Sequence, residues 1–413
     1  MKILVVVDSI NVNDSSGSKA NVSLIHNLAK AGYEVLVYHY SRKNIQFQGV
    51  TCVSIKERKF SLFYLLSRSQ REISRITKIN FNSKIESIFG FSFTFFNDSN
   101  SIKEGLKKVQ NFESDWVLTL SMASSFRPHK ALLGLPEWHS KWLAYIHDPY
   151  PMHSYPRPYD WVEPGHQFKR DFFLEIIEKA RYVLYPSKFL ADWMQSYYHN
   201  QKGKEIIVPH QIAKETIDLS LLPTYFNLNY FNILHAGNMM SARNPIALIE
   251  AFEKFVEQTP KAKNHSKLYF IGSPSCFDEQ IKEKQKMMPQ LFLSKEYVPF
   301  QTVLAMQYLT SVNVILEALG PLSPFLPGKF THCVQARKPI LLLGPFFSES
   351  KRLLGNDYAY WSAIDDVDLI HSHINALYYL WLENKNHLIM DRPDLMYYLS
   401  EAHLQKTINE LKP

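Results

Sequence analysis

The first forty residues, 1-MKILVVVDSI NVNDSSGSKA NVSLIHNLAK AGYEVLVYHY-40, decide the fold class. Ile3–Val7 is an apolar run without alternation, which is typical of a strand buried on both faces of a parallel sheet. Asp8–Gly17 is a predicted polar loop, and Val35–Tyr38 is the next predicted strand. The intervening helix is indicated by an apolar face of Ala20, Leu24, Ile25, Leu28 and Ala29, with Gly32 just past its end. The stretch therefore predicts a β-α-β unit.

The same alternation continues along the chain in two series. Further strands are predicted at Trp116–Leu120, Trp142–Ile146 and Tyr182–Tyr185, then at Phe231–His235, Leu268–Ile271, Val312–Leu316 and Ile340–Leu343. Helices are predicted between them, for example at Pro245–Glu257 and Lys329–Ala336. We therefore expect two facing, doubly wound α/β domains with parallel sheets. Their predicted bounds are 1–209 and 230–394, with a linker at 210–229 and a C-terminal helix at 395–413 that packs back on the first domain.

Length and composition exclude several classes of protein. The chain has 413 residues, about two to three times an ordinary domain of ~150 residues. Apolar residues make up 46% and charged residues 21%, so the chain is not disordered. The 14 glycines are never closer than Gly320 and Gly328, which excludes both G-x-G-x-x-G and the P-loop motif.

Cysteines and hydropathy indicate the compartment. Cys52, Cys276 and Cys333 are far apart and show no metal-binding spacing, which favours a reducing compartment. The apolar run Ile3–Val7 is too short for a signal-peptide core, and no run approaches the ~18 apolar residues of a membrane span. We therefore expect a cytoplasmic protein, either soluble or peripheral on the inner face of the cell membrane.

The basic excess is concentrated in one segment. Residues 40–110 contain 13 Lys and Arg against five Asp and Glu, a net charge of +8, whereas the whole chain carries +7. Phenylalanines and tyrosines alternate with these cations, which suits an anionic membrane surface. The competing interpretation is a solvated helix face over an ordinary core. A nucleic-acid partner is not expected, because no RNA-binding signature accompanies the charge.

Polar residues follow a predicted strand of the first domain. Ligands of open parallel sheets bind at the carboxyl ends of the strands. His147 and Asp148 come directly after Trp142–Ile146 and could donate a proton or a hydrogen bond to a substrate. The alternative is a pair that only stabilises its loop.

Two basic residues stand near predicted helix starts in the second domain. Arg243 precedes Asn244 and Pro245, a capping residue and a first helical residue, and Gly237 allows close backbone approach. Lys329 lies in the first turn of its helix, where a cation is unfavourable unless an anion binds there. Together Arg243 and Lys329 suit a diphosphate held by point charges and backbone amides.

These motifs resemble those of the retaining family-4 glycosyltransferases, which have the B-type (GT-B) fold. In the family element G-R-L-x-x-x-K-G, Gly237 matches the first Gly and Arg243 the Lys, while Asn238 stands at the Arg. The two acids of the family's E-x7-E element fall on Pro324 and His332. The stretch 323-SPFLPGKFTHCVQARKPILLLGP-345 resembles a variant with a Pro-rich loop and a Lys at that place.

The resemblance implies a glycosyltransferase that uses a nucleotide-diphosphate sugar, in particular a UDP-sugar, with retention and without a metal or other cofactor. The implied acceptor is a glycan or lipid-linked glycan in the synthesis of cell-surface polysaccharide or glycoconjugates. The implied catalytic residues are His147 and Asp148, with His147 near the transferred sugar. The implied donor contacts are Gly17, Gly237, Arg243 and Lys329 for the diphosphate, Ser323, Pro324, Phe325 and Leu326 for the sugar, and Val298 for the base.

Two rival functions remain at this stage. One is a UDP-sugar 2-epimerase of the same fold, which needs carboxylates and histidine for proton transfer at carbon. The other is a non-catalytic relative that binds sugar nucleotides and has lost activity together with the two acids. Epimerised UDP-sugar without acceptor would indicate the first, and donor binding without turnover the second.

Overall fold

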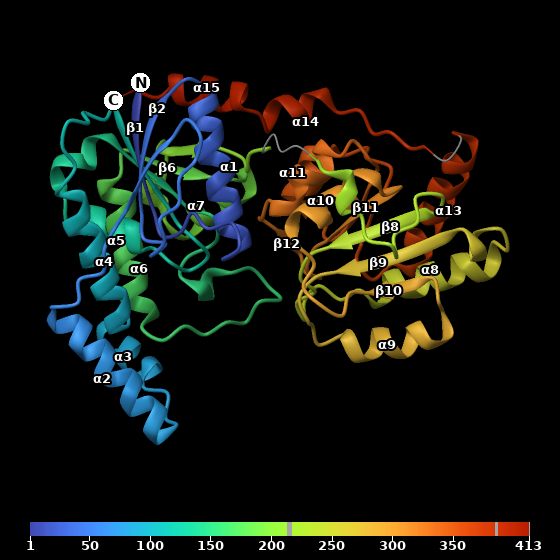
Figure 1. Ribbon diagram of the computed structural model, residues 1–413, viewed down its shortest axis with the longest axis horizontal. Helices are drawn as coiled ribbons and strands as arrows, with labels where there is room; N and C mark the ends of the chain where they lie inside the picture. Colours follow the sequence, from blue (N-terminus) through green and yellow to red (C-terminus); the bar gives the residue numbers. More distant parts are fainter. Residues whose placement is uncertain (213–216, 385–386, 413) are drawn as a thin grey trace. The chain divides into compact units, whose positions relative to one another are not determined.

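The computed structural model describes residues 1–212, 217–384 and 387–412. The chain divides into two units, the first made of Met1–Tyr155, Tyr159–Ala213 and Leu399–Pro413, the second of Pro156–Pro158 and Lys214–Tyr398. Each unit is built on one parallel sheet covered by helices (Figure 1). The two-domain α/β fold class expected from the sequence is therefore confirmed.

The sheet of the first unit has seven strands, all parallel to their neighbours. In spatial order these are β3 (Thr51–Ser54), β2 (Glu34–His39), β1 (Lys2–Val7), β4 (Trp116–Leu120), β5 (Trp142–Tyr145), β6 (Tyr182–Tyr185) and β7 (Glu205–Ile207). Successive side chains of β1 enter two different cores, Leu4 and Val6 on one face and Ile3 and Val5 on the other. The continuous apolar run follows from this burial on both faces.

The helices of this unit are α1 (Ser16–Lys30), α2 (Leu62–Thr77), α3 (Asn82–Phe89), α4 (Phe93–Leu106), α5 (Arg127–Leu133), α6 (His166–Lys179), α7 (Lys188–Tyr197) and α15 (Glu401–Asn409). Helices cover the sheet, but α2 and α3 extend away from it (Figure 1). The C-terminal helix α15 packs on α1. The hydroxyl of Tyr33, shortly after α1, donates to Asn409 Oδ1 of α15 at 2.9 Å. Helix α1 begins earlier than the predicted loop Asp8–Gly17 allows, because Ser15 caps it by accepting from the Ser18 amide at 3.0 Å.

The second unit has a six-stranded parallel sheet and a two-stranded parallel ladder. In spatial order the sheet contains β10 (Leu291–Leu293), β9 (Ser266–Ile271), β8 (Phe231–Ala236), β11 (Val312–Leu316), β13 (Ile340–Leu343) and β15 (Trp361–Ser362), and the ladder joins β12 (Leu322–Ser323) to β14 (Phe347–Ser348). The helices are α8 (Ile246–Gln258), α9 (Asp278–Met287), α10 (Phe300–Leu309), α11 (Gly328–Gln335), α12 (Glu349–Leu354), α13 (Val367–Glu383) and α14 (Pro393–Tyr398). Within the described ranges, no helix is both long and apolar enough to span a bilayer.

Candidate functional site

In the second unit, polar side chains from several elements meet beyond the carboxyl end of β8. Gly237 follows β8 and has a φ of +144°, and a Cβ there would lie 2.5 Å from Lys329 Nζ. A side chain at position 237 would therefore displace the lysine. Lys329 is the second residue of α11, and its Nζ lies 3.5 Å from Nε2 of His235. Together, His235, Arg243, Glu317 and Lys329 around Gly237 are called the Arg–Lys site below.

Glu317 is the acid of the Arg–Lys site, and the sequence did not single it out. It directly follows β11 and is only 3% exposed. Its Oε1 accepts from Ser350 Oγ at 2.5 Å, and Ser323 and Ser348 also hydrogen-bond to the carboxyl group. Oε2 is buried without a hydrogen-bond partner among the described residues. The only signal for Glu317 in the sequence is an acid immediately after the all-buried strand β11.

Burial sets the charge states of the Arg–Lys site. It raises the pKa of Glu317 to about 7, and it lowers the pKa of Lys329 to about 7, with Arg243 adding repulsion. Burial also lowers the pKa of His235 well below its ordinary value, so this histidine is neutral at pH 7. Lys329 is thus a cation that desolvation disfavours and an anionic ligand would favour.

Among the residues that the structure describes, the two cations of the site form no close ion pair. In the described part of the chain, no carboxylate lies within 4.0 Å of a charged nitrogen of Arg243 or Lys329. Arg243 Nε is buried and also has no hydrogen-bond partner within the described ranges. A pair of partly buried cations that makes no close ion pair is suited to bind a polyanion.

Lys329 lies in the first turn of its helix as predicted, and the helix after Arg243 begins one residue later than predicted. Helix α8 begins at Ile246 with Pro245 as its N-cap, so Arg243 lies in the preceding loop and Pro245 is not the first helical residue. Asn244 still acts at this end, because its Oδ1 accepts from the Ile246 amide at 2.9 Å. Arg243 therefore lies in the loop just before α8, close enough to Lys329 for electrostatic repulsion between them.

The remaining predicted donor residues occupy two places. Ser323 is buried in β12 and hydrogen-bonds to Glu317, so the start of the Pro-rich loop is tied to the Arg–Lys site. Pro324 and Leu326 are buried and Phe325 is half-buried. Val298 is half-buried before α10 and packs on an apolar cluster of Phe226, Leu234, Ala236, Tyr269, Ile271 and Met306.

In the first unit, His147 lies in a buried polar chain after β5. Its Nε2 is 2.6 Å from Asn21 Oδ1, and Asn21 Nδ2 donates to the Ser121 carbonyl at 3.1 Å. Because the Asn21 amide nitrogen is the donor to Ser121, Oδ1 is left to accept from Nε2–H of His147. Burial, together with the nearby His210, lowers the pKa of His147 well below its ordinary value. His147 is thus a neutral, oriented imidazole.

Gly17 and Asp148 complete the predicted residues of the first unit. Gly17 is the second residue of α1, so the stretch Ser15–Ser18 is a capped helix start and not a loop. A Cβ on Gly17 would lie 3.2 Å from Cγ of Met122, in the segment after β4 that also contains the His147 partner Ser121. Asp148 is half-buried in the turn that follows His147.

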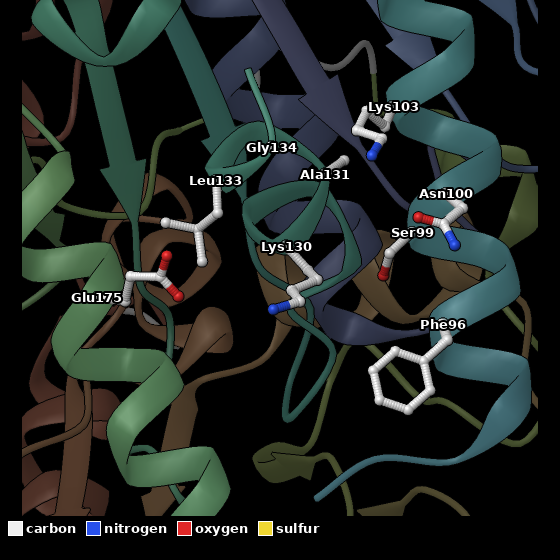
Figure 2. A pocket seen from close by; sticks show the side chains of 9 residues that line it. All are labelled: Phe96, Ser99, Asn100, Lys103, Lys130, Ala131, Leu133, Gly134 and Glu175. Atoms are coloured by element: carbon white, nitrogen blue, oxygen red, sulfur yellow. The ribbon is translucent and has the colours of Figure 1, made fainter. Parts of the chain in front are cut away.

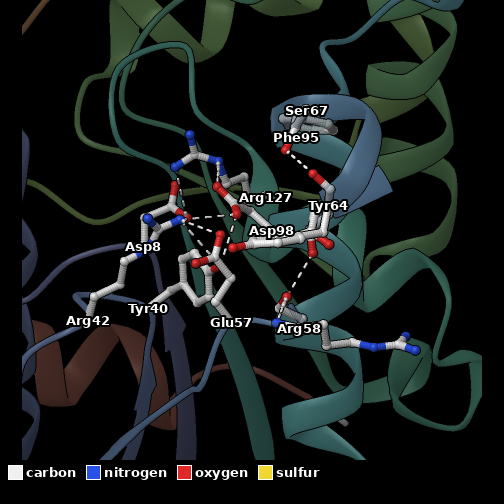
Figure 3. A network of polar contacts seen from close by, with 12 residues as sticks. Asp8, Tyr40, Arg42, Glu57, Arg58, Tyr64, Ser67, Phe95, Asp98 and Arg127 are labelled. Atoms are coloured by element: carbon white, nitrogen blue, oxygen red, sulfur yellow. Dashed lines mark hydrogen bonds and ion pairs between the residues drawn. The ribbon is translucent and has the colours of Figure 1, made fainter. Parts of the chain in front are cut away.

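A second polar network, which the sequence did not indicate, surrounds Arg127 (Figure 3). Arg127 lies 3.7 Å from Asp8 and 3.4 Å from Asp98, and the Tyr40 hydroxyl donates to Asp98 Oδ1 at 2.9 Å. Burial raises the pKa of both carboxyl groups, and Arg127 opposes the shift. These charges are largely paired with one another, so the network is best explained as holding α4 and α5 to the end of β1.

One cavity of about 210 Å³ lies elsewhere on the first unit, between α4, α5 and α6 (Figure 2). Its lining contains Lys103, Lys130 and Glu175 but none of the predicted site residues. No group of three or more His, Cys, Asp or Glu side chains in the described ranges is placed to hold a metal ion.

The comparisons with known proteins agree with this fold. No protein-family model matches the sequence, and no curated protein is significantly similar to it. Among solved structures, an α,α-trehalose-phosphate synthase (UDP-forming) from Burkholderia xenovorans in complex with glucose-6-phosphate has a TM-score of 0.63 at 10% identity over 99% of both chains. A trehalose-6-phosphate synthase has a TM-score of 0.61 at 12% identity over 100% of both chains. A glycosyltransferase from Rickettsia africae has 0.56 at 13% identity over 99% of this chain and 93% of that one.

At such low identities these similarities show the fold. The chain has two Rossmann-like domains, as the B-type glycosyltransferases do, over essentially its whole length. The fold expected from the resemblance is therefore confirmed.

Proposed function

We propose that the protein is a glycosyltransferase that moves a sugar from a nucleotide-diphosphate sugar, in particular a UDP-sugar, to an acceptor hydroxyl. The observation that carries this proposal is the Arg–Lys site at the carboxyl end of β8, where no carboxylate of the described residues lies within 4.0 Å of a charged nitrogen of Arg243 or Lys329. A sugar-linked diphosphate carries two negative charges and matches two cations. The fold supports the same conclusion, since the similar structures include a UDP-forming synthase.

The proposed chemistry is a front-face transfer with retention. The bond between the anomeric carbon and the diphosphate oxygen breaks, the acceptor oxygen bonds to that carbon, and the acceptor proton passes to the leaving diphosphate. Arg243 and Lys329 stabilise the charge that develops on the leaving group. His147, neutral and oriented by Asn21, hydrogen-bonds a hydroxyl of the transferred sugar. Asp148, the next residue of the same loop, is the second proposed catalytic residue.

The finer assignments extend this proposal. Gly237 and Gly17 allow close approach to the diphosphate, residues 323–326 shape the sugar pocket, and the backbone at Val298 pairs with the base. The acceptor is a glycan or lipid-linked glycan of cell-surface polysaccharide or glycoconjugate synthesis, reached by peripheral attachment to the cytoplasmic face of the membrane. Support for a sugar acceptor comes from the glucose-6-phosphate complex of the Burkholderia xenovorans structure. Support for the membrane comes from the net charge of +8 in residues 40–110.

A ligand panel followed by a turnover assay tests the proposal. Thermal shift with UDP, GDP, ADP and their sugars should show the largest stabilisation with a UDP-sugar. Arg243→Ala should lose this shift, whereas Lys282→Ala, which removes an exposed cation from α9, should keep it. UDP release with a glycan acceptor pool should continue in EDTA, because no metal is part of the proposed mechanism. Release of epimerised sugar, or binding without any turnover, would contradict the transferase.

A further inference from the structure

Residues 58–89, called the α2–α3 hairpin below, extend away from the sheet of the first unit (Figure 1). Its base is fixed on both arms. Ser61 Oγ donates to Asn97 Oδ1 at 2.6 Å, and Phe63 stacks on Phe96 with ring centroids 5.1 Å apart. Glu86 of α3 pairs with Lys169 of α6 at 2.8 Å. The hairpin is therefore an anchored projection of the first unit.

The outer face of this projection is apolar. Positions 62, 65, 69, 73 and 76 follow one another at three or four residues and therefore lie on one face of α2. All of them except Ser69 are apolar, so Leu62, Leu65, Ile73 and Ile76 form one stripe. Their exposed fractions are 69%, 60%, 48% and 76%. Phe60, Ile79, Ile88 and Phe89 are also exposed.

This concentration of apolar surface is local. Of the 26 large apolar side chains that are exposed in the described ranges, eight lie in these 32 residues. Single exposed apolar side chains need no explanation, but a gathered set marks an interaction surface.

Cations flank the apolar stripe. The hairpin contains seven Lys and Arg against two Glu, a net charge of +5. Arg68, Arg71 and Arg75 are exposed on α2, Arg68 and Arg75 to one side of the stripe and Arg71 on the face away from it. Arg75 pairs with Glu72 at 2.6 Å, and the other acid, Glu86, pairs with Lys169. The surface thus presents apolar side chains bordered by cations that lack enough acids of their own.

We propose that the α2–α3 hairpin docks on an anionic lipid bilayer, with the Leu and Ile stripe in the interface and the Arg and Lys side chains at the headgroups. The inference specifies the membrane contact that the proposed function includes. A bilayer with anionic headgroups neutralises the +5 charge. A symmetric dimer through the same stripe would instead bring seven cations of one copy against seven of the other.

Vesicle co-sedimentation of the full chain tests this docking and needs no turnover, so its failure leaves the transferase proposal standing. We expect binding to vesicles with one-third phosphatidylglycerol and little binding to pure phosphatidylcholine. Binding should fall steeply with salt, because exposed charges are screened over about 10 Å at 0.1 M. Ile73→Ser with Ile76→Ser should weaken binding about tenfold, since two exposed apolar side chains would no longer enter the bilayer interface.

Matched variants separate the hairpin from nonspecific attraction. Met287→Ser with Tyr297→Ser removes two similarly exposed apolar side chains from the second unit and should leave binding unchanged. The docking proposal is overturned if the full chain stays in the supernatant at low salt, or if both double variants weaken binding equally. It is also overturned if light scattering shows a dimer that the Ile73 and Ile76 changes dissociate, which would assign the stripe to a second copy.

Discussion

Lys329 links donor binding to pH. Burial and Arg243 hold its pKa at about 7, and burial raises that of Glu317 to about 7. As pH rises through 7, Lys329 loses its positive charge and Glu317 gains a negative one, so both changes disfavour an anion. The diphosphate of a UDP-sugar does not titrate in this range.

We therefore predict that UDP-sugar affinity falls between about pH 6 and pH 8.5, by up to about tenfold per pH unit for each group. Binding above pH 7 should take up protons, which calorimetry detects as a dependence of the heat on buffer ionisation. Lys329→Ala should bind more weakly and lose the part of the pH dependence that the lysine contributes, leaving the shallower decline that comes from ionisation of Glu317. A flat affinity profile for the parent protein would show that neither group titrates at the ligand.

His147 is predicted to serve turnover and not nucleotide binding. His147→Ala should keep UDP affinity within about twofold but lose most of the turnover number, typically a hundredfold for a lost positioned polar group. Because burial keeps this imidazole neutral, its titration should not appear as a limb near pH 6.5 in the rate profile. Unchanged turnover in the variant would show that His147 has only a structural role, in its hydrogen bond to Asn21.

The sequence predicted some residues of the site and missed others, depending on whether their partners are near in the chain. Lys329 was found because a cation in a first helical turn is locally unfavourable. Glu317 was missed because its serine partners Ser323, Ser348 and Ser350 come from the ladder segment and from α12. The side-chain partner of the His147 imidazole is Asn21, 126 residues earlier, whereas the sequence drew attention to the adjacent Asp148.

At the scale of elements, the central strands were predictable and the edge strands were not. β4, β6, β11 and β13 have the predicted bounds, because strands buried on both faces are nearly continuous apolar runs, with only Thr119 in β4 and Asn313 in β11 as buried polar exceptions. β3, β7 and β10 lie at sheet edges and are only three or four residues long. Because they also include exposed or half-buried positions, their sequences contain no long apolar run that would predict a strand.

The sequence shows how many aromatic residues the basic segment contains, but not which of them face the core and which face solvent. Phe91 packs in the core against Phe95 with centroids 4.2 Å apart, whereas Phe60 and Phe89 face solvent. Both sets look alike in sequence. Only the placement of α2 and α3 decides which side chains form the outward surface.

The base of the α2–α3 hairpin makes a prediction on stability. Gly165 has a φ of +69°, and a Cβ there would lie 2.1 Å from the Glu86 carbonyl oxygen. Gly165→Ala should therefore lower the free energy of unfolding by at least about 3 kcal/mol, more than the ~1–2 kcal/mol of a left-handed conformation alone.

Gly203→Ala is the matched control, since Gly203 has a φ of +83° but nothing within 4 Å of its would-be Cβ. In urea denaturation, the free energy of unfolding of Gly203→Ala should fall only by the ~1–2 kcal/mol cost of a left-handed conformation. Equal losses for the two variants would mean that the packing of Gly165 against α3 does not constrain the hairpin.

At the scale of the whole molecule, the fold was the most predictable feature. Each of the two series of apolar runs and amphipathic helices predicted one parallel sheet, and each unit has one such main sheet. The pattern is visible in sequence because a doubly wound sheet requires buried strands to alternate with covering helices. What a function needs beyond the fold is a site, and the Arg–Lys site is the strongest one that the described residues contain.

Calorimetric titration of a UDP-sugar tests the central claim most directly. The parent protein should bind, and Arg243→Ala and Lys329→Ala should each weaken binding about 10- to 150-fold, or roughly 1.5–3 kcal/mol, because each removes a charge-assisted hydrogen bond to the diphosphate. Lys282→Ala, an exposed cation of the same unit, should bind as the parent does. Affinities within twofold of the parent for both site variants, while all variants remain folded, would contradict the assignment of the Arg–Lys site to the donor.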